Sequence, residues 1–118
     1  MSGSLEVMRS LALALPETEE KSHFDIPDFR VKGKVFCTAR TGEPLCMVKL
    51  PPQIQEALVA GHPGAIAPAA GAWGRGGATM VRTDLIDHAL LADLIALAWR
   101  RVAPAKLVAF HYPDGKPD

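Results

Sequence analysis

Two apolar stretches joined by a very short turn constrain the fold of this chain more than any other feature of its sequence. The stretches KVFCTAR (34–40) and LCMVKL (45–50) flank the turn TGEP (41–44). A two-residue loop with glycine at its first central position is typical of a tight β-hairpin. In the register that this loop sets, Cys37 faces Val48. The hairpin is then predicted to have one apolar face, made of Val35, Cys37, Ala39, Cys46, Val48 and Leu50.

Both cysteines of the chain fall on this predicted apolar face. With Ala39 opposite Cys46, Cys37 and Cys46 are diagonal neighbours whose backbones lie roughly 7 to 8 Å apart, beyond the usual reach of a disulfide. A slipped register would instead place them opposite each other. Two cysteines inside apolar runs also differ from the spaced pairs of metal sites and from the framework of a small secreted protein. We therefore expect two buried, reduced thiols.

The helices are predicted from apolar residues that recur every three or four positions. Segment 5–15 keeps this spacing between a serine, which suits a helix start, and a proline, which suits a helix end. Segment 51–61 begins with two prolines and ends with glycine, as a short helix does. The longest apolar stripe follows Asp84 or Asp87, either of which can cap a helix, and Pro104 ends it. The sequence therefore predicts three helices.

Short β-type runs separated by turn residues predict the strands. HFDI (23–26) and DFRVKG (28–33) follow a charged stretch at 17–21, and ATMVR (78–82) precedes the longest helix. The predicted order is one helix, about three strands, a helix, one or two strands and a helix. This order predicts an α+β fold, in which two layers form a single domain over residues 1–118 and helices pack on an antiparallel sheet. From about residue 109 we expect a flexible tail.

Composition narrows the possible functions. Thirteen basic residues balance thirteen acidic ones, so no overall positive field attracts nucleic acid and any binding surface must be local. No apolar run reaches the ~18 residues that a membrane span requires. The start of the chain, MSGSLEVM, lacks the basic flank and apolar core of a secretion signal. We therefore expect a soluble, cytoplasmic protein without a membrane partner.

The segment GAWGRGGATMVRTD (71–84) is the strongest candidate for contact with a ligand. It has neither the Gly-Lys-Ser/Thr ending of a P-loop nor the G-x-G-x-x-G spacing of a dinucleotide-binding turn. Its glycines would still let backbone amides approach a phosphate, with Arg75 as a bidentate partner. The alternative is a mobile loop that feeds a strand. Trp73 in this segment is a candidate recognition residue, whereas Trp99 on the longest helix is expected in the core.

The titratable residues do not form a pattern typical of an enzyme active site. His23 and Asp25 share a face of a predicted strand, but a general base also needs a substrate cavity, and a metal site usually needs three or four ligands. The other three histidines are scattered along the chain, and no H-E-x-x-H, nucleophile elbow or CxxC motif occurs. We therefore expect no catalytic, metal-binding or cofactor-binding residues, and no cofactor.

Four blocks of the sequence resemble the MmcQ/YjbR family. They are LPETEEKSHFDIPDFRVKGKVFCT, MVKLPPQIQEAL, GAWGRGGATMVRTD and DHALLADLIALAWRRVAPAKL, which together cover most of the chain. The resemblance rests on the order of the blocks rather than on any single signature. It implies a compact α+β domain, described as CyaY-like and similar in shape to type III secretion chaperones, and a DNA-binding role.

Basic residues on the predicted strands suggest how such a role would be carried out. Strand alternation places Arg30 and Lys32 on one face, where they could contact phosphates if that face is solvated. The alternative is a solvated rim balanced by acids. Arg100 and Arg101 suit the end of a helix, where the dipole favours cations. The predicted nucleic-acid-binding residues are Arg30, Lys32, Lys34, Lys49, Trp73, Arg75 and Arg82.

Two functions therefore follow from the sequence. The first is a binding module for DNA, and the alternative is a protein-interaction or chaperone-like module that does not bind DNA. A stripe of basic side chains would favour DNA, whereas an apolar patch larger than a few hundred Å² would favour a protein partner. The sequence indicates neither a DNA sequence preference nor an oligomeric state.

Overall fold

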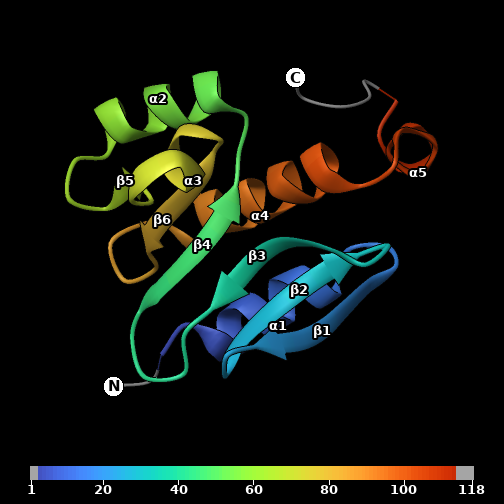
Figure 1. Ribbon diagram of the computed structural model, residues 1–118, viewed down its shortest axis with the longest axis horizontal. Helices are drawn as coiled ribbons and strands as arrows, with labels where there is room; N and C mark the ends of the chain where they lie inside the picture. The colour runs from blue at the N-terminus through green and yellow to red at the C-terminus, as the bar shows by residue number, and fades with distance from the viewer. Residues whose placement is uncertain (1–2, 114–118) are drawn as a thin grey trace.

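The computed structural model describes residues 3–113 and shows an α+β domain built on one antiparallel sheet (Figure 1). The elements in chain order are α1 (Leu5–Leu13), β1 (Thr18–His23), β2 (Ile26–Val31), β3 (Lys34–Ala39), β4 (Leu45–Lys49), α2 (Pro52–Gly61), β5 (Ile66–Pro68), α3 (Gly71–Arg75), β6 (Ala78–Arg82), α4 (His88–Val102) and α5 (Ala105–His111). This architecture confirms the predicted fold class. None of the described helices has both the length and the apolar character needed to cross a membrane.

The strands lie in the order β1-β2-β3-β4-β6-β5, and every neighbouring pair is antiparallel. After β4 the chain forms α2, β5 and α3 and then returns as β6, which pairs directly with β4. The outer strands of the sheet are therefore β1 at one edge and the short β5 at the other. Because α3 immediately precedes β6, it lies close to the end of β4.

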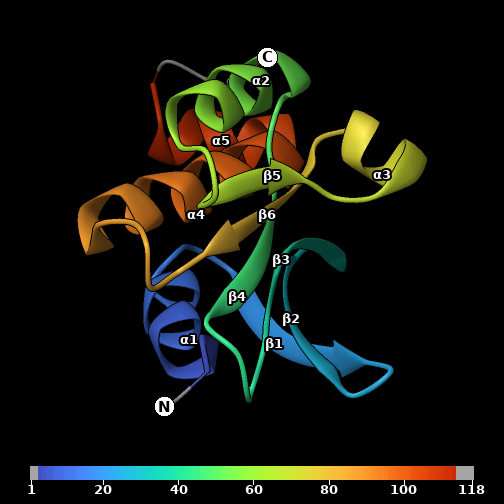
Figure 2. The ribbon, with the colours of Figure 1, turned by 90° about the vertical axis from the view of Figure 1, so that its left-hand side faces the viewer.

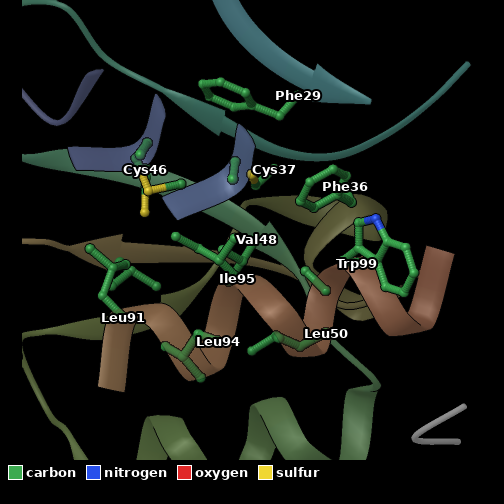
Figure 3. Close-up of a cluster of buried hydrophobic side chains, with 14 of the residues drawn as sticks. Phe29, Phe36, Cys37, Cys46, Val48, Leu50, Leu91, Leu94, Ile95 and Trp99 are labelled. Carbon is green, nitrogen blue, oxygen red and sulfur yellow. The ribbon is translucent and has the colours of Figure 1, made fainter. Parts of the chain in front are cut away.

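Helices α1 and α4 cover one face of the sheet (Figures 1 and 2). The apolar stripe predicted for the longest helix meets the strands there, because its side chains point toward those of β3 and β4 (Figure 3). Trp99 is fully buried, and its indole N–H donates a hydrogen bond of 3.0 Å to the carbonyl of Pro16. This confirms the prediction that Trp99 belongs to the core. The buried residues of α4 are Leu91, Leu94, Ile95, Ala98 and Trp99.

The hairpin of β3 and β4 has the predicted register, but its pairing ends at Ala39 and Cys46, and Gly42 lacks the positive φ of the predicted two-residue turn. Cys37 pairs with Val48 and Ala39 pairs with Cys46. Both cysteines are buried, free thiols. Burial raises the pKa of Cys37 well above its usual value and that of Cys46 to about 12. Neither sulfur is therefore a reactive thiolate near neutral pH.

One member of the predicted apolar face lies on the other side of the sheet. The register between β2 and β3 shifts after Phe29, so that Arg30 pairs with Val35 and Phe36 is an extra residue. At such a β-bulge, two residues of one strand oppose one residue of its partner, which breaks the alternation. Phe36 consequently lies in the core with Cys37, and Val35 lines a cavity beside Arg30. The prediction that Val35 belongs to the core face was wrong.

The first strand also differs from the prediction. β1 is formed by the polar segment TEEKSH, whereas Phe24 and Asp25, predicted as part of a strand, form the turn into β2 with φ of 49° and 63°. An edge strand with a solvated face needs no apolar alternation, so this strand leaves little trace in the hydrophobic pattern. Four strands therefore precede α2, where about three were predicted.

Two short helices were not predicted. Helix α3 occupies part of the glycine-rich segment, and α5 follows Pro104. Val108 of α5 is fully buried, and the ring of Tyr112 packs against that of Trp99 with 5.6 Å between centroids. The segment predicted as a flexible tail therefore begins within α5. Residues 114–118 of that segment lie outside the described part of the chain.

Candidate functional site

The sheet face turned away from α1 and α4 presents a group of polar side chains, and we call it the open face. Figure 2 shows α3 and the turn between β1 and β2 projecting on this side. The bulge adds Val35 to this face, and each of the first four strands contributes side chains to it. The open face is defined by His23, Asp28, Arg30, Val35, Thr38, Met47 and Lys49.

Two cavities adjoin each other at this face. The first has a volume of about 220 Å³ and is lined by His23, Arg30 and other side chains of the open face, together with Trp73. The second has a volume of about 270 Å³ and is lined by residues of α3, of the start of β6 and of the end of α4, including Arg101. Lys49 and Trp73 line both cavities. These two residues therefore form the centre of the candidate site.

A buried carboxylate organises one part of the open face. Asp28 is fully buried, and its two oxygens accept hydrogen bonds of 2.8 and 3.0 Å from the guanidinium of Arg30. Nδ1 of His23 lies 2.6 Å from Oδ2 of Asp28. The hydrogen bonds from Arg30 lower the pKa of Asp28 by more than burial raises it, and the hydrogen bond with His23 lowers it further. The pKa of Asp28 is therefore below its usual value. An ionised Asp28 accepts a hydrogen bond from Nδ1–H of His23, which leaves Nε2 of His23 available to a ligand.

This arrangement differs from the pair of His23 and Asp25 that was considered from the sequence. Asp25 lies in the turn at positive φ, so it does not continue the face of His23. The partner of His23 is Asp28 on the neighbouring strand. Among residues 3–113, no three side chains of metal-binding type gather closely enough to hold an ion.

Lys49 is a half-buried cation at the end of β4. Burial lowers the pKa of its ammonium group, and the charge of Arg101 lowers it further. Within the described part of the chain, no carboxylate lies within ion-pair distance of this ammonium. Arg101 donates hydrogen bonds from Nη1 to the carbonyls of Leu50, at 2.5 Å, and Gly76, at 2.9 Å. An anion near Lys49 would offset the repulsion between these two cations.

Helix α3 places Trp73 at the two cavities, with 59% of the residue exposed. The position of α3 depends on close approaches that a side chain would prevent. A Cβ atom on Gly74 would lie 1.8 Å from the carbonyl oxygen of Ala69. A Cβ atom on Gly77, where φ is 112°, would lie 2.0 Å from the oxygen of Leu50. Glycine is therefore required at both positions to hold α3 against the end of β4.

A buried amide on α2 also holds α3 in place. Gln55 donates hydrogen bonds from Nε2 to the carbonyls of Gly74, at 3.0 Å, and Ala78, at 3.1 Å. The amide groups of Gly76 and Gly77 donate to carbonyls within the same short helix and its end. These two amides are therefore engaged by the chain itself, contrary to a phosphate cradle built from them.

Three of the seven residues predicted to bind nucleic acid come together. Arg30, Lys49 and Trp73 line the cavity of about 220 Å³ on the open face. Lys32 does not share the strand face of Arg30, because it lies in the turn between β2 and β3 at a φ of 51°. Its ammonium forms an ion pair with Glu17.

The other three predicted residues lie apart from these cavities. Lys34 is an exposed residue at the start of β3. Arg75 lines a different cavity beside α2 and β5. Arg82 lies at the far end of β6 from Lys49 and forms an ion pair of 2.8 Å with Asp84. Of the six predicted basic residues, Arg30 and Lys49 thus lie at one cavity and the other four lie elsewhere, so they form no stripe along the sheet.

Two residues of the site, Asp28 and Arg101, were not identified from the sequence. Asp28 lies two positions before Arg30 on β2, and this spacing could have indicated a pair on one strand face. Arg101 meets the end of β4 only through tertiary packing of α4, and no local pattern indicates that contact.

Comparisons with known proteins agree with this fold. A model of the YjbR family matches residues 13–101. The structure is similar to the crystal structure of Deinococcus radiodurans protein DR2400, described as having the domain DUF419, with a TM-score of 0.72 and 20% sequence identity over 93% of this chain and 88% of that one. At this identity the likeness concerns the fold alone. A search of curated proteins gave no significant match. Because the family match spans most of its length, the chain belongs to the YjbR (MmcQ/YjbR) family.

Proposed function

We propose that this protein is a non-catalytic module that binds nucleic acid, DNA in the first instance, at the open face. The observation that carries the proposal is the position of Lys49, a half-buried ammonium without a carboxylate partner among the described residues, next to the exposed indole of Trp73. A phosphate would supply the missing negative charge, and a base would supply a flat partner for the indole. Each base stacked on an aromatic ring contributes about 1–3 kcal/mol to binding.

The size of the cationic cluster predicts a modest electrostatic contribution. Lys49 lines both cavities and Arg30, whose charge is paired with Asp28, lines one of them, whereas the chain as a whole has no net charge. One or two phosphate contacts correspond to a slope of roughly −1 to −2 in a plot of log K against log salt concentration. Binding should therefore be detectable at low salt. As the salt concentration rises, it should weaken about equally for unrelated DNA sequences, since phosphate contacts carry no base information.

Replacing Lys49 by methionine tests the proposal. Methionine keeps most of the volume of the side chain and removes a half-buried charge, so Lys49→Met should raise the melting temperature or leave it unchanged. The same change should weaken binding of a fluorescently labelled oligonucleotide and make the salt slope shallower by about one unit. Lys106→Met, an exposed lysine on α5, is the matched control and should change neither quantity.

Two results would contradict the proposal. The first is native protein that shows no salt-dependent oligonucleotide binding even at low ionic strength. The second is equal affinity in Lys49→Met and in the Lys106→Met control, because the binding surface would then lie elsewhere.

A second candidate function is binding of another protein, and one observation favours it. A cavity of about 400 Å³ lies between α2 and α4 and is lined mostly by apolar side chains, including Leu58, Leu97 and Tyr112. Grooves of this kind between helices suit an apolar segment of a partner. Failure of oligonucleotide binding in the experiment above would favour this function over nucleic-acid binding.

A further inference from the structure

The turn between β1 and β2 presents an aromatic residue that the domain itself does not use. Phe24 is 94% exposed, although phenylalanine is ordinarily buried. Among the described residues, the aromatic ring that contacts it is His23, edge-on, with 6.2 Å between centroids. The packing of this domain therefore does not explain why phenylalanine occupies this position.

The backbone of the turn makes phenylalanine more unusual there. Phe24 and Asp25 both have positive φ, of 49° and 63°, which favours asparagine, aspartate or glycine. The turn between β2 and β3 has the same combination of signs, and glycine occupies its second position, Gly33. A bulky residue at positive φ is strained. The two-residue hairpin itself imposes the positive φ, and what it does not explain is an exposed phenylalanine at this position. A ligand that contacts the ring would explain that choice of residue.

The neighbours of Phe24 indicate which ligand. His23, which precedes it and contacts its ring, lines the cavity that also contains Arg30, Lys49 and Trp73. Figure 2 shows the β1–β2 turn and α3 projecting on the same side of the sheet, with the open face between them. The site therefore has an exposed aromatic residue on each of these two projections and cations in the cavity between them.

We propose that the ligand is single-stranded DNA, with one base stacked on Phe24, a second base stacked on Trp73, and the intervening phosphates held by Arg30 and Lys49. This inference rests on the proposed function and narrows it. Non-specific binding of single strands combines a cationic groove with aromatic stacking platforms. In a duplex the bases are already stacked and paired, so they cannot present their faces to two separate rings.

The first part of the test compares the binding of single-stranded and duplex DNA. A labelled oligothymidylate should bind more tightly than a duplex of the same length and label at the same low salt. Stacking of a single base on Phe24 corresponds to at least about a fivefold change in affinity. Equal or tighter binding of the duplex would overturn the inference and leave the proposed function intact.

The second part removes one aromatic ring without disturbing the turn. Asparagine tolerates positive φ, so Phe24→Asn should keep the melting temperature or raise it, while it weakens single-strand binding by about fivefold or more and leaves duplex binding unchanged. Phe110→Asn is the control, because Phe110 on α5 is 83% exposed and lies outside both cavities. Phe24→Tyr keeps an aromatic ring and should retain the single-strand affinity of the native protein. Equal single-strand affinity in Phe24→Asn and Phe110→Asn would overturn the assignment of Phe24.

The failures of the two proposals are distinguishable. If Lys49→Met weakens binding and Phe24→Asn does not, nucleic-acid binding stands and the two-ring arrangement is wrong. If no oligonucleotide binds at low salt, both proposals are wrong.

Discussion

Replacing Asp28 by asparagine should destabilise the protein in a way that depends on pH. The carboxylate is fully buried and takes part in three hydrogen bonds, two with Arg30 and one with His23. A hydrogen bond to a charged group contributes about 1.5–3 kcal/mol. Asparagine can retain part of this network, and the side chain of Arg30 is one-quarter exposed, so its guanidinium can regain water. We therefore expect Asp28→Asn to lower the free energy of unfolding by about 3 kcal/mol at neutral pH.

The pH dependence follows from the lowered pKa of Asp28. A carboxyl group whose pKa falls on folding contributes stability that is fully present above its unfolded pKa of about 3.9. That contribution is lost as the pH falls from the unfolded pKa through the folded pKa, at a limiting rate of about 1.4 kcal/mol for each pH unit between them. The difference between the native protein and Asp28→Asn should therefore be smaller near pH 3 than at neutral pH.

Urea unfolding at the two pH values, followed by the fluorescence of the buried Trp99, measures this difference. Asp93→Asn, an exposed aspartate on α4, is the control and should stay within about 0.5 kcal/mol of the native protein. A loss for Asp28→Asn below about 1 kcal/mol at neutral pH would refute the reasoning. So would a loss that is the same at both pH values, since Asp28 would then not be an ionised acceptor.

Three further predictions concern glycine, tryptophan and cysteine. Gly77→Ala should lower the free energy of unfolding, measured in urea, by about 2 kcal/mol or more, because the added Cβ atom would lie 2.0 Å from a carbonyl oxygen. Gly42→Ala is the control and should be tolerated, because a Cβ atom there would have no neighbour within 4 Å. Trp73→Ala should leave the melting temperature unchanged, while Trp99→Ala should lose about 3–5 kcal/mol. Cys46, whose pKa burial raises to about 12, should react with thiol reagents at mildly alkaline pH only after denaturant is added.

The predictable part of the fold is the part in which one face of an element is buried. The pairing of Cys37 with Val48 was predicted from two apolar runs that flank a short loop, and the structure confirms this register although the turn itself differs. The stripe of α4 repeats with the helical period, and those residues form much of the core. In both cases the burial of one face makes apolar residues recur at a regular spacing, and this spacing predicts the type of element and its buried face.

The parts that were not predicted lack such a period. The polar strand β1 is an edge strand, and the extra residue Phe36 changes the side of Val35 without any local signal. The site was partly predictable, because basic residues on strands and an exposed tryptophan were recognised as candidates. The pairing of His23 with Asp28 and the approach of Arg101 to the end of β4 depend on tertiary contacts between separate elements. Single-sequence patterns do not contain that information.

The emission of Trp73 during titration with oligothymidylate tests the central claim most directly. The two tryptophans differ strongly in exposure, because Trp73 is 59% exposed and Trp99 is fully buried. The account predicts a saturable change in emission at low salt, with the same dissociation constant as a labelled strand gives, and loss of that change in Trp73→Phe. Binding of the labelled strand without any change in the emission of Trp73 would contradict the claim that nucleic acid binds at the open face.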